Sequence, residues 1–149
     1  IGKLSDLRSK HFGYVDTKSA SGYIYARHMF KIDGLDPDKL FGRVSFMGSH
    51  DNVIKSVLSG ELDGGATYSE AIDMAKAAGL PVSELEILVK TEDIPKDAIA
   101  VSFKLPNEVV EEMKQAFMAY DGTASKESPV QGFAESDDKK YDVIRAVAG

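Results

Sequence analysis

The chain of 149 residues is long enough to bury the core of one self-standing domain, or most of one. Its 18 basic and 24 acidic side chains leave a net charge of −6 with no basic run, which argues against nucleic acid as a partner, and no apolar stretch approaches the roughly 20 residues of a membrane span. The absence of cysteine excludes disulfides and thiolate metal sites.

The first third of the chain alternates strand and helix patterns. Residues 12–15 form an apolar run too short for a helix, so a strand is predicted there. Apolar residues then recur at three- and four-residue spacing over residues 22–32 and stop at Gly34, which predicts a helix. A loop or single turn around Pro37 leads to a second predicted strand at residues 43–47.

The middle of the chain continues this alternation. An apolar stripe within residues 53–58 predicts a helix that Gly60 closes in a left-handed conformation. The glycine-rich residues 61–66 predict a turn into a short strand that another backbone or a ligand can approach closely. A third helix is predicted over residues 69–78, with Ser69 as its cap and a glycine as its stop. The alternation favours a largely parallel sheet covered by helices on both faces.

The last third of the chain carries a different pattern. Two more strands are predicted at residues 85–90 and 98–103, separated by a turn. A strongly amphipathic helix is predicted over residues 106–120, followed by a polar loop at 121–128. A final helix is predicted at residues 141–147 and needs a surface on which to pack.

Two strand-to-helix loops carry residues suited to binding an anion. The first contains Ser19, Ala20, Ser21 and Gly22, and the second contains His50 within a Gly-Ser-His-Asp segment. Free backbone amides at a helix start, together with small hydroxyl side chains, form a pocket for a tetrahedral oxyanion. Because both loops leave one sheet, we expect a shared anion-binding crevice. The alternative is that the serines only cap a helix and that the histidine is an ordinary surface residue.

Other residues indicate no chemistry by themselves. Neither a nucleotide-binding P-loop spacing nor the Gly-x-Ser-x-Gly elbow of serine hydrolases is present. The three histidines lie too far apart in sequence for a helical metal site, so no metal is expected. No cofactor is expected either. Glu70 suits the first turn of a helix, Asp97 suits a turn, and Tyr68 suits either core or rim.

Six segments together resemble, in order and spacing, the phosphonate/phosphite-type substrate-binding proteins of bacterial ABC importers. They are residues 16–23, 35–41, 48–51, 60–63, 94–97 and 105–106, and the resemblance runs from about residue 4 to residue 141. It implies the type II periplasmic binding fold, in which two α/β lobes joined by a hinge hold the ligand between them. By this resemblance the chain is the second lobe with a C-terminal return segment.

The resemblance also implies roles for individual residues. The Ser19–Ser21 loop, with Gly22, and His50 hold the phosphorus oxygens. Glu70 and Asp97, with Tyr68 as a further candidate, lie across the ligand, where aminophosphonate binders of the family engage an ammonium group. Ala20 stands where family members commonly have a hydroxyl residue, so one hydrogen bond is missing.

The family's first lobe, of about a hundred residues, has no counterpart in this chain. The chain also begins without methionine, so we expect that upstream sequence was removed. Residues 1–104 are interpreted as the ligand-binding α/β lobe and residues 105–149 as the helical return segment. Its helices would pack on the missing lobe or drive self-association.

The sequence therefore favours a solute-binding component that recognises a phosphonate or related phosphorus oxyanion for ABC-type uptake, without chemistry. An importer permease would be its partner, and its location would be periplasmic or extracellular, with a lipid anchor as one form of attachment. An extracytoplasmic sensor domain of a membrane signalling protein is the alternative. A hydrolase with Ser21 as nucleophile and His50 as base ranks last, because no third orienting group is evident.

Overall fold

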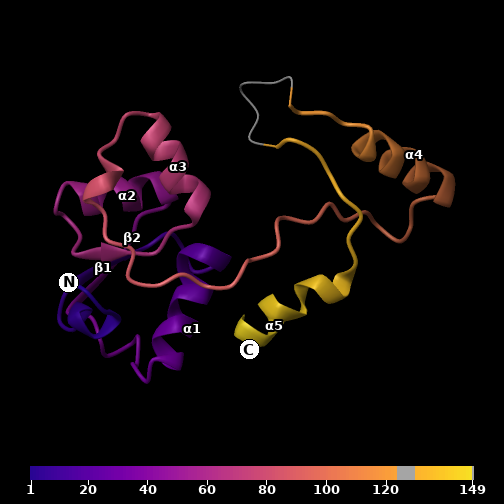
Figure 1. The fold of residues 1–149 in the computed structure, drawn as a ribbon. Coiled ribbons are helices and arrows are strands. Elements are labelled where there is room, and N and C mark those ends of the chain that lie inside the picture. The colour runs from indigo at the N-terminus through magenta and orange to yellow at the C-terminus, as the bar shows by residue number, and fades with distance from the viewer. Residues whose placement is uncertain (124–129, 149) are drawn as a thin grey trace. The chain divides into compact units, whose positions relative to one another are not determined.

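The computed structural model describes residues 1–123 and 130–148 (Figure 1). The chain forms two compact units, one made of Ile1–Ile94 with Val143–Gly149 and the other of Pro95–Asp142. The functional boundary expected between residues 104 and 105 stays a prediction. None of the helices within the described ranges is long and apolar enough to cross a membrane.

A three-stranded parallel sheet forms the centre of the first unit. Its strands are β1 (His11–Tyr14), β2 (Arg43–Phe46) and β3 (Gly64–Gly65), in the order β2-β1-β3. Phe12 pairs with Val44 on one side and with Gly64 on the other, so β1 is flanked by both neighbours and its apolar side chains are buried. The three predicted strands in this part of the chain and their parallel arrangement are confirmed.

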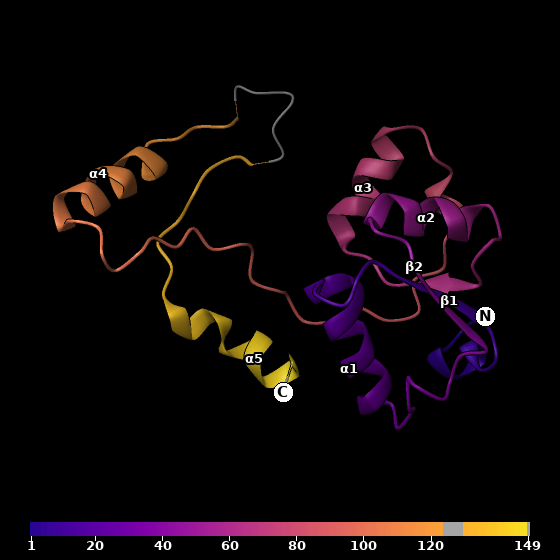
Figure 2. The ribbon, with the colours of Figure 1, turned by 180° about the vertical axis from the view of Figure 1, so that it is seen from behind.

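Helices cover both faces of this sheet, as expected. The turn η2 (Ala20–Ile24) runs directly into α1 (Tyr25–Ile32), while α2 (His50–Leu58) and α3 (Ser69–Ala77) follow β2 and β3. Figures 1 and 2 show α1 on one side of the sheet and α2 with α3 on the other. Helix α1 thus connects β1 to β2 and α2 connects β2 to β3, as in βαβ units, and α3 follows β3.

The ends of these helices agree with the sequence in all but one detail. Gly60 and Gly79 adopt φ angles of 78° and 85°, the left-handed geometry that ends a helix without a Cβ clash. Ser69 was expected to cap α3, and this prediction is wrong by one position. Tyr68 is the extended residue before the helix, at φ −119° and ψ 159°, while Ser69 is already helical and its side chain cannot act as the cap.

Two apolar clusters hold the sheet between its helices. On the α1 side, the buried aromatic ring of Phe12 stacks on Phe41 at a centroid distance of 4.5 Å and meets Phe30 edge to face at 5.5 Å. On the other side, Ile54 of α2 packs against alanines of α3. Burying one such side chain contributes about 1.5–3 kcal/mol, so these contacts supply much of the driving force for this unit.

The close approach predicted at the glycine-rich strand is confirmed, and it is a helix that approaches. A Cβ placed on Gly65 would overlap Val53 Cγ1 of α2 and would lie 3.2 Å from the carbonyl oxygen of Gly13. Only glycine lets α2 pack this tightly on β3.

The strands predicted at residues 85–90 and 98–103 are wrong. After the short turn η3 (Val82–Glu84), the described chain is irregular until α4, and its sheet contains only β1, β2 and β3. Alternating apolar residues such as Ile87 and Val89 remain exposed there. A strand needs a neighbouring backbone with which to pair, and the described residues supply none to these segments.

The second unit contains α4 (Asn107–Met118) and the turn η4 (Asp138–Tyr141). On α4, Phe117 contacts the ring of Phe133 at 4.9 Å, and Lys114 forms a 2.7 Å ion pair with Glu135. The amphipathic helix predicted at 106–120 is confirmed. The polar loop predicted at 121–128 lies largely outside the described residues, because residues 124–129 are not among them.

The final predicted helix is confirmed as α5 (Asp142–Ala148).

Candidate functional site

The predicted anion-binding loops lie at one edge of the sheet. Because β1, β2 and β3 are parallel, their carboxyl ends meet at the same edge, and η2, α2 and α3 all begin there. In open α/β sheets this edge is where ligands bind. Hydrogen bonds fasten the loops to each other: Met47 N–H donates to Tyr14 O at 2.8 Å, and Gly48 N–H donates to Val15 O at 2.9 Å.

The loop after β1 ends in a short π-helical turn, η2. Hydrogen bonds in η2 run over five residues, as from Ile24 N–H to Ser19 O at 3.0 Å, so the first amides of the turn have no acceptor within the helix. These include the amides of Ala20 and Ser21, two of the residues expected to bind phosphorus oxygens. The π geometry is rare and concentrates at functional sites.

Ser19 caps this turn, as the simpler alternative proposed. Its Oγ accepts a hydrogen bond from Gly22 N–H at 3.0 Å. A hydroxyl that accepts a hydrogen bond still has its own proton to donate, so the cap leaves Ser19 able to contact an anion. Gly22 is buried, and a Cβ there would overlap Val15 and lie 2.8 Å from Ser19 Oγ. The turn therefore requires glycine at this position.

His50 opens α2 immediately after its cap, Ser49, whose Oγ accepts from Asn52 N–H at 3.1 Å. The half-buried imidazole has Nδ1 3.1 Å from the Oγ1 of Thr67. Burial lowers the pKa of His50 below 6.5, and the nearby Asp16 carboxylate acts in the opposite direction. The ring is therefore neutral at pH 7 and carries one N–H donor and one acceptor.

Tyr68 lies directly against His50. Their rings meet edge to face, with centroids 4.5 Å apart and planes at 87°. Glu70 follows in the first turn of α3, where a carboxylate favours the positive end of the helix dipole, and its side chain is exposed. Asp97 belongs to the second unit, so its expected role on the far side of a ligand stays a prediction.

Thr67 was not singled out from the sequence. It is an isolated residue after a two-residue strand, and no motif surrounds it. Its contact with His50 depends on β2 and β3 lying on either side of β1, which brings two loops 17 residues apart to the same edge. Across the described ranges, no group of three or more histidine or acidic side chains is arranged to hold a metal ion.

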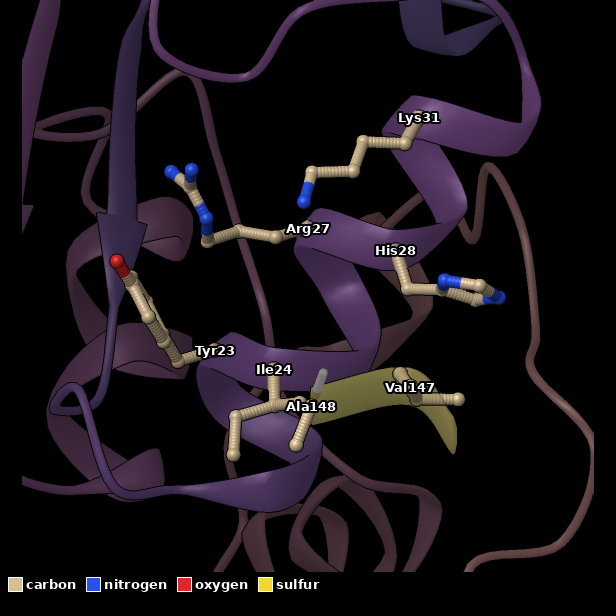
Figure 3. Close-up of a pocket in the computed structure, with 7 residues that line it drawn as sticks. All are labelled: Tyr23, Ile24, Arg27, His28, Lys31, Val147 and Ala148. Atoms are coloured by element: carbon tan, nitrogen blue, oxygen red, sulfur yellow. The ribbon is translucent and has the colours of Figure 1, made fainter. Parts of the chain in front are cut away.

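A second pocket lies along α1 and includes the last two residues of η2, Tyr23 and Ile24. Its lining comprises Tyr23, Ile24, Arg27, His28, Lys31, Val147 and Ala148. Figure 3 shows Arg27 and Lys31 extending to one side of α1 and His28 to another. Arg27 is held by both carboxylate oxygens of Asp38, at 2.9 and 2.7 Å. This bidentate pair occupies much of the donor capacity of Arg27, so the pocket is a weaker candidate for anion binding.

The chain is similar in sequence to known proteins. The family model for periplasmic substrate-binding proteins of phosphonate ABC transporters matches residues 1–141. The phosphate-import protein PhnD of Mycolicibacterium smegmatis is 26% identical over an alignment covering 92% of this chain and 44% of that protein.

Two solved structures share the fold. The binding protein component of an ABC phosphonate transporter from Pseudomonas aeruginosa has a TM-score of 0.78 at 24% identity, covering 97% of this chain and 50% of that one. A Xanthomonas citri protein bound to a chloride ion has a TM-score of 0.72 at 20% identity, covering 99% and 59%. The chain thus spans about half the length of the proteins it matches. The expected α/β lobe of the type II periplasmic binding fold is confirmed.

Proposed function

Because this chain belongs to the family of periplasmic substrate-binding proteins of phosphonate ABC transporters, we propose that it forms the ligand-binding lobe of a solute receptor for a phosphorus oxyanion. The observation that carries the proposal is the convergence of three helix starts, with Ser19–Ser21 and His50, at one edge of the sheet. The ligand class comprises phosphonate, phosphite and phosphate. Members of the family bind a substrate for transport, so the proposed activity is capture without chemistry.

The donors proposed for the oxyanion are uncharged. They are the amides of the η2 turn, the hydroxyls of Ser19 and Ser21, and the neutral imidazole of His50. Such donors suit a chain of net charge −6, because the dipole of a helix start acts over short distances and does not depend on the field of the whole molecule. Each hydrogen bond to a charged oxygen contributes about 1.5–3 kcal/mol.

Two carboxylates are proposed to select among phosphorus compounds. Glu70 lies in the first turn of α3, which begins at the same edge of the sheet, and Asp97 is included because the family resemblance implies the same role for it. A pair of carboxylates attracts the ammonium group of an aminophosphonate and repels a second anionic group on the ligand. The proposed preference is therefore for aminophosphonates over phosphonates that carry a carboxylate as a second anionic group.

We further propose an importer permease as the partner, and a lipid anchor as one means of retaining the protein at the membrane. Self-association would involve the apolar groove of the second unit. Its lining residues, on α4 and the segment that returns past it, are Met113, Ala116, Phe117, Tyr120, Val130 and Phe133. A groove of this composition would bury apolar surface against another copy of the chain.

Titration of the ¹⁵N-labelled chain followed by NMR chemical shifts tests the binding proposal. One lobe provides one wall of a crevice, so we expect millimolar affinity for methylphosphonate, phosphite or phosphate, with shifts concentrated at residues 19–23 and 49–51. Ser21→Ala should weaken binding by about 1–2 kcal/mol, because it removes one hydroxyl donor to a charged oxygen.

The matched control is Ser59→Ala. Ser59 caps the far end of α2 and donates to Ser56 O at 3.2 Å, so its loss should leave the affinity unchanged. Sulfate and chloride serve as ligand controls for general anion binding. Shifts scattered over the surface, or equal losses from both serine variants, would contradict the proposed site.

A further inference from the structure

We propose that Thr67 is a positioning residue for the anion site: its hydroxyl engages Nδ1 of His50 and so directs the Nε2–H of that ring toward the ligand. The inference rests on the proposed function, because it names a role for Thr67 in the same site. Three features carry it, namely the place of the contact in the sheet, the chemistry of a neutral imidazole, and the packing of Tyr68.

The contact joins two loops across the end of a third strand. His50 follows β2 and Thr67 follows β3, and these strands lie on opposite sides of β1. The 3.1 Å separation of Nδ1 and Oγ1 therefore ties the start of α2 to the loop before α3 at the carboxyl edge of the sheet. The η2 turn with its amides follows β1, the strand between them. A residue in this place can orient the histidine relative to the turn.

The hydrogen bond can run in either direction, and each direction corresponds to a different position of the ring proton. A neutral imidazole has one N–H and one lone pair, and a threonine hydroxyl can serve as either donor or acceptor. If the hydroxyl donates to Nδ1, the proton of the ring resides on Nε2 and is available to an anion. If Nδ1–H donates to the hydroxyl, Nε2 presents a lone pair that repels an anion. An oxyanion site requires the first arrangement.

Neighbouring groups restrict the ring further. The edge-to-face contact with Tyr68 at 4.5 Å opposes rotation of the imidazole, and the β-branch of Thr67 limits the positions of its hydroxyl. The carboxylate that acts on the ring is that of Asp16, on the loop after β1, while Asp51 follows His50 on α2 and pairs with Lys55 at 2.8 Å, and Glu70 lies in the first turn of α3. The Asp16 carboxylate favours the protonated ring and burial, the larger effect, opposes it, so the ring is neutral and its tautomer determines what Nε2 presents.

The test uses three variants of the chain. Thr67→Val keeps the shape of the side chain and removes the hydroxyl, and Thr67→Ser restores a hydroxyl. Thr91→Val is the matched control, because Thr91 is a threonine outside the site whose hydroxyl donates to Glu92 O at 2.7 Å. Thermal unfolding of each variant shows whether it is folded, and if Thr67→Val is not, the tautomer of the His50 ring in the wild type carries the test.

The first measurement is made without ligand. Long-range ¹H–¹⁵N correlation of the His50 ring should show the Nε2–H tautomer in the wild type and in Thr67→Ser, and a mixture of tautomers in Thr67→Val.

The second measurement is methylphosphonate affinity, which Thr67→Val should reduce about tenfold, while Thr67→Ser stays close to the wild type. The loss of affinity in Thr67→Val should be smaller at pH values below the pKa of His50, because a protonated ring donates from both nitrogens. A merely structural loss would not depend on pH in this way.

The outcomes separate the two proposals. An Nδ1–H tautomer in the wild type, or a Thr67→Val affinity equal to that of Thr91→Val, overturns the role of Thr67 while the proposed function stands. Absence of methylphosphonate, phosphite and phosphate binding in the wild type overturns the proposed function and, with it, the role of Thr67 in ligand binding.

Discussion

The η2 turn offers a sharp test of how the sequence builds the anion site, through the substitution Gly22→Ala. An added Cβ would overlap Val15 Cγ2 and would lie 2.7 Å from Val15 Cβ and 2.8 Å from Ser19 Oγ. All three separations are shorter than real Cβ contacts allow, so either the turn or the end of β1 must shift.

Two opposing effects set the size of the change. Overpacking a well-packed position costs about 1–3 kcal/mol. Alanine in a helix is about 1 kcal/mol more favourable than glycine, which offsets part of that cost. We therefore expect Gly22→Ala to lower the free energy of unfolding by up to about 2 kcal/mol. Because Ser19 caps the turn through Gly22 N–H at 3.0 Å, the same shift should also weaken phosphonate binding.

Urea denaturation followed by circular dichroism measures the first effect, and NMR titration measures the second. Gly2→Ala is the control, because nothing lies within 4 Å of a Cβ at that position and its stability should match the wild type. If Gly22→Ala proved as stable as the wild type or more so, the propensity gain would have outweighed the clash, and the packing argument for glycine in this turn would be wrong.

Two further predictions concern ionisable groups. Because burial lowers the pKa of His50 below 6.5, the unfolded chain binds its proton more readily than the folded chain, and the stability of the wild type relative to His50→Gln should fall as the pH decreases through 6.5. A pH-independent difference between the two in urea denaturation would contradict this assignment. Glu70→Ala and Asp97→Ala should each weaken binding of 2-aminoethylphosphonate more than that of phosphite, with Glu108→Ala, in the first turn of α4, as a control. Equal losses for both ligands would exclude an ammonium contact.

Much of the fold followed from local patterns. The strands and helices between residues 11 and 79 lie within about three residues of their predicted positions, because periodicity, caps and glycine stops are properties of neighbouring residues. Gly60 shows this well, since a left-handed residue after an apolar stripe ends α2 as predicted. The family resemblance likewise depended on short motifs at fixed spacing, and the family match over residues 1–141 confirms it.

Prediction from local sequence patterns failed where an element depends on contacts with distant parts of the chain. Ile87 and Val89 alternate as strand residues do, but a strand forms only beside another backbone, and the described residues pair none with them. The Ser69 cap was misplaced by one residue because side-chain type alone cannot say which backbone is still extended at a helix start.

The sequence alone therefore established the order of strands and helices between residues 11 and 79, the two donor-rich loops and the family. Only the tertiary structure showed that β1 lies between β2 and β3, that η2 is a π turn capped by Ser19, and that Thr67 and Tyr68 contact His50. The reason is physical: backbone periodicity is a property of neighbouring residues, whereas contacts among loops depend on the order in which strands pair, and pairing is decided by the packing of the whole unit.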